Sequence, residues 1–206
     1  MTIKRGTGIG SMYYGIGYGF SRPDIGAASI EMAEDGTTTV YSGATEMGQG
    51  IMTVVAQITA ETLGIRLETI RVIAADTGGT PDSGPTSGSR ATFVQGVAVQ
   101  AAAEELRDHL LGMAAEMQHC ETEELEVHDG EVYHTGTETP LLTVPAVAAE
   151  MHRLGKHTSS TGWQDNFTQD VDPETSQGDA YATYGWSTQM NGQMVAFREA
   201  HWLHIH

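Results

Sequence analysis

Two glycine-rich loops, each followed by apolar residues at helical spacing, constrain the fold of this chain most. The first loop is GATEMGQG, Gly43–Gly50, and the second is DTGGTPDSGPTSGSR, Asp76–Arg90. Glycine is favoured where the backbone takes a positive φ or where another group approaches it closely. The apolar positions that follow are Ile51, Val54, Val55, Ile58 and Leu63 after the first loop, and Val94, Val97, Ala101, Leu106, Leu110, Met113 and Met117 after the second. The pattern therefore predicts two loops that each lead into the N-terminus of a helix.

Both predicted helix starts have the chemistry of a ligand site. A helix N-terminus offers unpaired N–H groups and a partial positive charge, and the amide of Gln49 both donates and accepts hydrogen bonds. Further polar side chains in the second loop are Thr86, Ser87, Ser89, Arg90 and Thr92. These features favour a phosphate-bearing heterocyclic ligand, provided that the two loops converge in space. The residues alone leave an alternative open, in which serine and threonine only cap the helix and glycine only relieves strain.

The charge balance narrows the classes of partner. The chain carries 27 acidic against 10 basic side chains, a net charge of −17, and only Lys4 and Lys156 are lysines. Nucleic acid and anionic membranes need lysine and arginine to neutralise phosphate, so neither is expected as a partner. An acid-rich, lysine-poor surface also favours a halophilic source. The N-terminus lacks an apolar signal region and no apolar run is long enough to span a bilayer, so we expect a cytoplasmic protein.

The remaining segments mix strands and helices without a regular βαβ alternation, which predicts an α+β fold. Hairpins are expected to turn at Asp35-Gly36 and at Asp129-Gly130, and Thr143 is placed to cap a short helix that ends at Gly155. The other expectations are a strand within residues 6–19, a strand at 69–75, a polar loop over 156–180 and a strand over Tyr181–Met190.

Three motifs in register resemble the xanthine dehydrogenase/aldehyde oxidase family of molybdenum hydroxylases. They are KRGTG at residues 4–8, GATEMGQG at 43–50, and DTGGTPDSGPTSGSR at 76–90. The resemblance lies in the molybdopterin-binding half of the large subunit, is strong over residues 3–110 and continues weakly to Met190. It implies an incomplete molybdopterin-binding domain over residues 1–190, followed by a divergent tail, residues 191–206, outside that fold.

The resemblance also implies a cofactor, a reaction and partners. Molybdopterin, alone or as a dinucleotide, would contact Gly48, Gln49, Gly50, Thr86, Ser87, Gly88, Ser89, Arg90 and Ala91. The pterin would hold the molybdenum, with no direct metal ligand in this chain. The implied reaction hydroxylates a small N-heterocycle or aldehyde with water as the oxygen source. Electrons would leave through 2Fe-2S and FAD centres on other chains or domains.

The sequence departs from the family in ways that bear on activity. The general-base glutamate of the family has no counterpart here, and the segment Asn191–His206 does not resemble the corresponding segment of the family. We therefore expect a piece of a larger enzyme that is inactive alone. The alternatives are a separately encoded piece of a split subunit, or a non-catalytic binding module that keeps the glycine loops for folding. His201, His204 and His206 are interpreted as a meaningless terminus, and Cys120 as a plain thiol.

Overall fold

The computed structural model describes residues 10–14, 23–165, 174, 185–190, 193–198 and 201–203, and describes side chains only within 23–165 and at 174. The chain divides into two compact units, one formed by residues 1–23 with 167–206 and the other by residues 24–166. The first unit holds an antiparallel sheet in the order β1-β9-β10-β11. Its strands are β1 (Gly10–Tyr14), β9 (Gly185–Met190), β10 (Gln193–Arg198) and β11 (His201–Leu203).

This sheet contains parts of two segments that were predicted as strands, within residues 6–19 and 181–190. The remainder of those segments lies outside the described residues, as do His204 and His206. Residues 193–198 of the predicted tail pair with β9. The proposed division at residue 190 stays a prediction.

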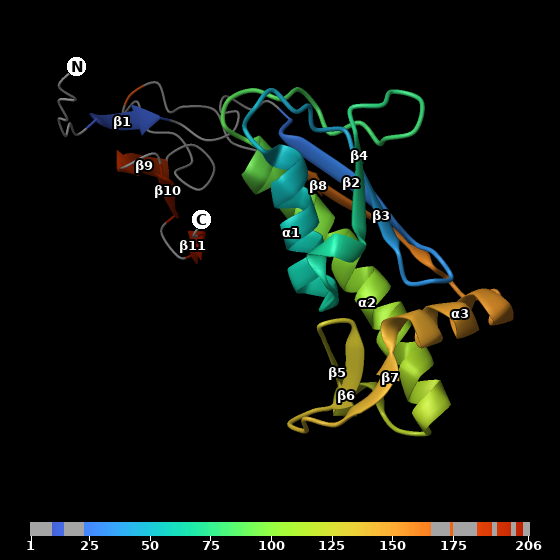
Figure 1. The fold of residues 1–206 in the computed structure, drawn as a ribbon. Coiled ribbons are helices and arrows are strands. Elements are labelled where there is room, and N and C mark those ends of the chain that lie inside the picture. Colours follow the sequence, from blue (N-terminus) through green and yellow to red (C-terminus); the bar gives the residue numbers. More distant parts are fainter. Residues whose placement is uncertain are drawn as a thin grey trace, which may run out of the picture. The chain divides into compact units, whose positions relative to one another are not determined.

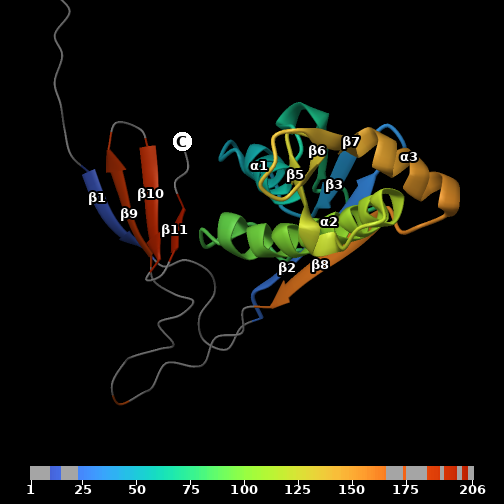
Figure 2. The ribbon, with the colours of Figure 1, turned by 90° about the horizontal axis from the view of Figure 1, so that it is seen from below.

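The second unit is built on a four-stranded mixed sheet in the order β4-β3-β2-β8 (Figures 1 and 2). The central pair is the predicted hairpin, in which the left-handed φ of +81° at Gly36 makes the turn. β3 and β4 run parallel and the other pairs antiparallel. The strands are β2 (Ile25–Met32), β3 (Thr38–Ser42), β4 (Ile70–Ala74) and β8 (Ser159–Asp165).

Two helices cover one face of this sheet, α1 (Ile51–Leu63) and α2 (Gly96–Gln118). α1 makes the crossover between β3 and β4, and it ends at Gly64 with φ +69°, as predicted. The apolar face of each helix meets the inward residues of the strands, and burying one such side chain stabilises the fold by about 1.5–3 kcal/mol. The largest fully buried apolar side chains are Ile30, Met32, Val40, Val55, Leu63, Val94, Val99, Leu106, Leu110, Val132 and Met151.

α2 approaches the sheet closely because glycine and alanine line the contact. A Cβ added at Gly162 would lie 1.9 Å from the carbonyl oxygen of Ala98, and one added at Gly26 would lie 2.5 Å from that of Val94. Ser160, which lies on β8 like Gly162, donates its hydroxyl to the carbonyl of Ala102 at 2.6 Å. The backbone of the helix therefore rests directly on β2 and β8.

This contact explains an error of the sequence prediction. Residues 156–180 were predicted as a polar loop, yet residues 159–165 form β8. The strand alternates exposed and buried positions as a half-buried strand should, but its buried positions are Ser160 and Gly162. Because the helix leaves no room for large apolar side chains there, the usual hydrophobic alternation is missing.

A smaller sheet lies at the C-terminal end of α2 (Figure 1). It contains β5 (Leu125–His128), β6 (Glu131–His134) and β7 (Pro140–Thr143), and α3 (Val144–Leu154) follows it. The hairpin at Asp129-Gly130 and the helix capped by Thr143 are confirmed, since Thr143 Oγ1 accepts the N–H of Ala146 at 3.3 Å. The predicted α+β fold class is confirmed.

Within the described residues, no helix is long and apolar enough to cross a membrane.

Candidate cofactor-binding loops

The two glycine-rich loops lie side by side at the end of the second unit where α1 and α2 begin (Figure 1). The N–H of Thr45 donates to Thr86 Oγ1 at 2.9 Å, and the N–H of Gly43 donates to Ser83 Oγ at 3.1 Å. Ser83 is buried and donates its own hydroxyl to the carbonyl of Ala27 on β2 at 2.8 Å. The two loops therefore adjoin, which is the condition on which the predicted ligand site depends.

The glycines of the first loop serve two different purposes. A Cβ at Gly43 would lie 2.5 Å from the carbonyl oxygen of Pro81 and 2.7 Å from Ser83 Oγ, so this glycine admits the second loop. Gly48 and Gly50 instead have φ values of +99° and +79°, and no atom beyond the adjacent residues lies within 4 Å of a Cβ built on either. Their backbone faces open space, as a loop must if a flat ligand is to lie against it.

The N-terminus of α1 is already occupied by a carboxylate. Glu46 Oε1 accepts the N–H groups of Gly48 at 2.8 Å and Gly50 at 2.9 Å, and Oε2 accepts that of Met52 at 3.3 Å. These bonds, that of Gly50 above all, hold the pKa of Glu46 below its ordinary value. The N–H groups of Gly48, Gly50 and Met52 at this helix start are therefore paired within the loop, contrary to the expectation of unpaired donors. Sequence reasoning missed Glu46, although an acidic residue shortly before the start of a helix is favoured by the helix dipole.

Gln49 is exposed, and its amide binds its own loop. Oε1 accepts the N–H of Met47 at 2.6 Å, and Nε2 donates to the carbonyl of Thr45 at 2.8 Å. A primary amide has two acceptor lone pairs and two donor hydrogens, so the arrangement leaves one of each for a further partner. The loop orients the amide without exhausting its hydrogen-bonding capacity.

Arg90 organises the second loop from the inside. Its guanidinium binds the carboxylate of Asp24 and the carbonyl of Ile25, and its Nη1 donates to the carbonyls of Ser83 at 3.0 Å and Pro85 at 2.8 Å. Only 3% of Arg90 and 1% of Asp24 is exposed. A cofactor contact for Arg90 stays a prediction. Asp24 was not singled out from the sequence, because its partner lies 66 residues away.

The other predicted residues of this loop lie at or near the surface. Ser87 and Ser89 are exposed, whereas Thr86, Gly88 and Ala91 are half-buried. The helix then begins as one π-helical turn, Ala91–Gln95, with no acidic residue in its first turn. Such turns occur often at functional sites. The start of the second helix therefore suits an anion better than the start of α1, which Glu46 caps.

Gln95 fixes this π-helical turn to the sheet. Its side chain is buried, donates from Nε2 to the carbonyl of Ala27 at 2.7 Å and to Ser42 Oγ at 2.9 Å, and accepts the N–H of Ala27 at 3.3 Å. Like Asp24, it was missed, because a glutamine in a helical pattern gives no sign of burial. The second loop and the helix start that follows it are thus attached to β2 through the buried side chains of Ser83, Arg90 and Gln95.

Comparison with known proteins identifies the family of this α+β domain and its two adjoining loops. A family model described as the molybdopterin cofactor-binding domain matches residues 1–194. The chain belongs to this family. The resemblance to molybdenum hydroxylases is confirmed.

Individual relatives agree with this assignment. The chain is 33% identical over 150 residues to a putative xanthine dehydrogenase molybdenum-binding subunit of Escherichia coli (strain K12), covering 72% of this chain and 20% of that protein. It is 34% identical over 123 residues to a probable xanthine dehydrogenase subunit of Bacillus subtilis (strain 168), covering 60% and 16%. The chain thus spans about a fifth of the length of these relatives or less.

Solved structures show the same fold. Quinoline 2-oxidoreductase from Pseudomonas putida 86 matches 95% of this chain with 25% of its own, at a TM-score of 0.68 and 20% identity. The aldehyde oxidoreductase of Desulfovibrio desulfuricans matches 93% of this chain with 18% of its own, at a TM-score of 0.56 and 26% identity.

Proposed function

We propose that the two adjoining loops form part of the molybdopterin site of a xanthine dehydrogenase-type molybdenum hydroxylase. Gly48, Gln49 and Gly50 from the first loop and residues 86–91 from the second would contact the cofactor. The observation that carries this proposal is the Thr45–Thr86 hydrogen bond, because it joins the two loops that contain the proposed contact residues. The open space beside Gly48 and Gly50 fits the approach of a flat pterin.

Each loop would have its own task. The free donor and acceptor of Gln49 suit the edge of a heterocycle, while the hydroxyls of Ser87 and Ser89 at the start of the second helix suit a phosphate. Arg90 and Gln95 would keep the second loop in one shape before the cofactor arrives, which lowers the entropy cost of binding. When bound, the cofactor would supply the molybdenum at which an N-heterocycle or aldehyde is hydroxylated with water as the oxygen source.

The names of the relatives also indicate what kind of enzyme would contain this site. Several bear the names of subunits of larger enzymes, among them a nicotine 6-hydroxylase large subunit and a subunit of a 6-hydroxypseudooxynicotine dehydrogenase complex, both from Paenarthrobacter nicotinovorans. We infer by analogy that FAD-binding and iron–sulfur subunits or domains complete the enzyme, that its substrate is a small molecule, and that the chain is inactive alone. A cytoplasmic location and a halophilic source, to which the net charge of −17 points, belong to the same proposal.

The test is to purify the chain, tagged in its source organism, together with the subunits that accompany it, and to measure molybdenum and pterin per chain. Gln49→Ala and Ser89→Ala each remove one hydrogen-bonding group, worth about 0.5–1.5 kcal/mol, so each should weaken cofactor retention by about two- to tenfold. Gln100→Ala is the matched control, since Gln100 is an exposed glutamine on α2 whose amide donates to Glu104 of the same helix.

The result that would overturn the proposal is an unchanged cofactor content in both loop variants. That outcome would favour the alternative in which the glycine loops only support the fold. Capture of the chain with no other subunit and no pterin would favour a stand-alone binding module, whereas capture with separately encoded partners would favour a split subunit.

A further inference from the structure

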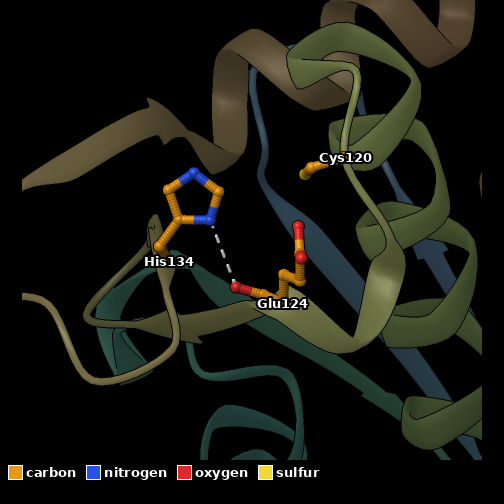
Figure 3. A group of neighbouring side chains, drawn as sticks. All are labelled: Cys120, Glu124 and His134. Carbon is orange, nitrogen blue, oxygen red and sulfur yellow. Dashed lines mark hydrogen bonds between the residues drawn. The ribbon is translucent and has the colours of Figure 1, made fainter.

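Three potential metal ligands from different elements meet at the far end of α2. Cys120 lies two residues beyond that helix, Glu124 ends a 3-10 turn (Thr122–Glu124), and His134 ends β6. One ligand atom from each side chain can be chosen so that all three atoms lie within 4.8 Å of one another. Figure 3 shows the three side chains grouped around one space beside the end of the helix.

Backbone hydrogen bonds fix the segments that carry these side chains. α2 ends at His119 in the left-handed region, φ 57°, and the N–H of Cys120 donates to the carbonyl of Ala115 at 3.2 Å. The N–H of Thr135 donates to the carbonyl of Glu124 at 2.8 Å, next to His134. The three positions are therefore held by the fold itself, as a preformed metal site requires.

A backbone carbonyl lies beside one ring nitrogen of His134. Its Nδ1 lies 3.4 Å from the carbonyl oxygen of Glu124, the contact drawn in Figure 3. A backbone carbonyl bound to one ring nitrogen is the usual way in which proteins orient a histidine whose other nitrogen binds a metal. The ring is half-buried, as is Cys120, and Glu124 is exposed.

The ligand chemistry selects among cations. A thiolate and an imidazole favour Zn²⁺ or another late transition metal, whereas Mg²⁺ and Ca²⁺ favour sites made only of oxygen. Three protein ligands with water in the fourth position satisfy the tetrahedral preference of Zn²⁺. Glu121 and Glu123, which flank the cluster in sequence, add negative charge that attracts a cation.

We propose that Cys120, Glu124 and His134 bind a divalent transition metal, with Zn²⁺ the best match, and so tie the β5–β6 hairpin to the end of α2. The site is separate from the candidate cofactor loops, which lie at the other end of this 23-residue helix, about 35 Å away at 1.5 Å per residue. The proposal does not rest on the proposed function. It also replaces the interpretation of Cys120 as a plain thiol with a defined role.

The experiment titrates the reduced, metal-free full chain with Co²⁺ and then Zn²⁺. We expect one equivalent of Co²⁺ to produce the near-ultraviolet charge-transfer band of a cobalt–thiolate bond, Zn²⁺ to displace it, and Zn²⁺ to raise the melting temperature. Cys120→Ser should abolish the charge-transfer band. His134→Gln should keep the band but weaken the affinity for Co²⁺ at least tenfold.

Two controls make the outcome decisive. The variant H201Q/H204Q/H206Q removes the terminal histidines, which could bind metal adventitiously, and should leave the band unchanged. His128→Gln alters an exposed histidine of the same hairpin and should have no effect. Absence of saturable Zn²⁺ binding at micromolar concentrations would overturn the proposal, as would binding that survives both Cys120→Ser and His134→Gln or disappears with the terminal histidines.

Discussion

The two glycine-rich loops look alike in sequence, yet the structure stabilises them in opposite ways. The first is held by exposed side chains of its own, with Glu46 and Gln49 binding N–H and carbonyl groups within a few residues. The second is held from beneath by Arg90, which is buried against Asp24 and three carbonyls. A local network adapts at little cost, whereas a buried ion pair fixes one shape. The chain therefore offers an adaptable loop beside a rigid one.

The largest effect that this contrast predicts follows from removing the buried cation. Arg90→Met leaves Asp24 buried without its guanidinium partner, so the free energy of unfolding should fall by about 3–5 kcal/mol in urea titrations followed by circular dichroism. Arg153→Ala is the control, since Arg153 pairs with Glu150 at the surface and its removal should cost about 0–1 kcal/mol. A loss for Arg90→Met no larger than for Arg153→Ala would show that the second loop is not fixed from inside.

A smaller effect is expected where the loops touch. Gly43→Ala places a methyl group against Pro81 and Ser83, which should cost about 1–3 kcal/mol through overpacking. Hydrogen exchange should accelerate at the N–H of Thr45, which binds the second loop, and stay unchanged at the N–H of Gly50, which binds Glu46.

The control is Gly112→Ala, because a Cβ at this position of α2 meets open space. This substitution should raise the free energy of unfolding by about 0.5–1 kcal/mol. Equal exchange changes at both amides would contradict the independence of the loops.

The smallest effect concerns the charge of Glu46. Its pKa is lowered in the folded state, chiefly by the N–H of Gly50, so the ionised carboxylate stabilises the fold above its ordinary pKa. Glu46→Gln should therefore lower the melting temperature at neutral pH. The difference from the parent should shrink as the pH falls below about 4.3, the ordinary pKa of a glutamate, because the unfolded chain then takes up a proton. The difference should disappear once the pH falls below the lowered pKa of the folded state. A difference that does not depend on pH would assign the effect to shape, not to charge.

Much of the fold could be predicted from local signals. Helical periodicity located α1 and α2, Asp-Gly pairs located both hairpins, and Thr143 and Gly155 marked the ends of α3. Each of these signals acts within a few residues, where propensity and capping decide the conformation. The convergence of the two loops was a condition of the predicted ligand site, and no local signal in either loop could establish it.

What escaped prediction depends on partners that are distant in the sequence. Ser159–Asp165 is a strand because α2 leaves room only for small side chains, and the sequence does not reveal that helix as a neighbour. Arg90 suggested a ligand contact because its partner Asp24 is 66 residues away along the chain. Glu46 was missed for a different reason, since its capping signal is local.

The backbone contact between α2 and β8 has a mechanical consequence. A Cβ at Gly162 would lie 1.9 Å from the carbonyl oxygen of Ala98, which is near the N-terminus of α2. Any larger residue at position 162 must therefore push the N-terminal half of α2 away from the sheet. The loop at residues 86–90 is continuous with that helix through its π-helical turn and would be carried along. A residue on the sheet that touches no ligand thus sets how far the second loop can reach toward the first.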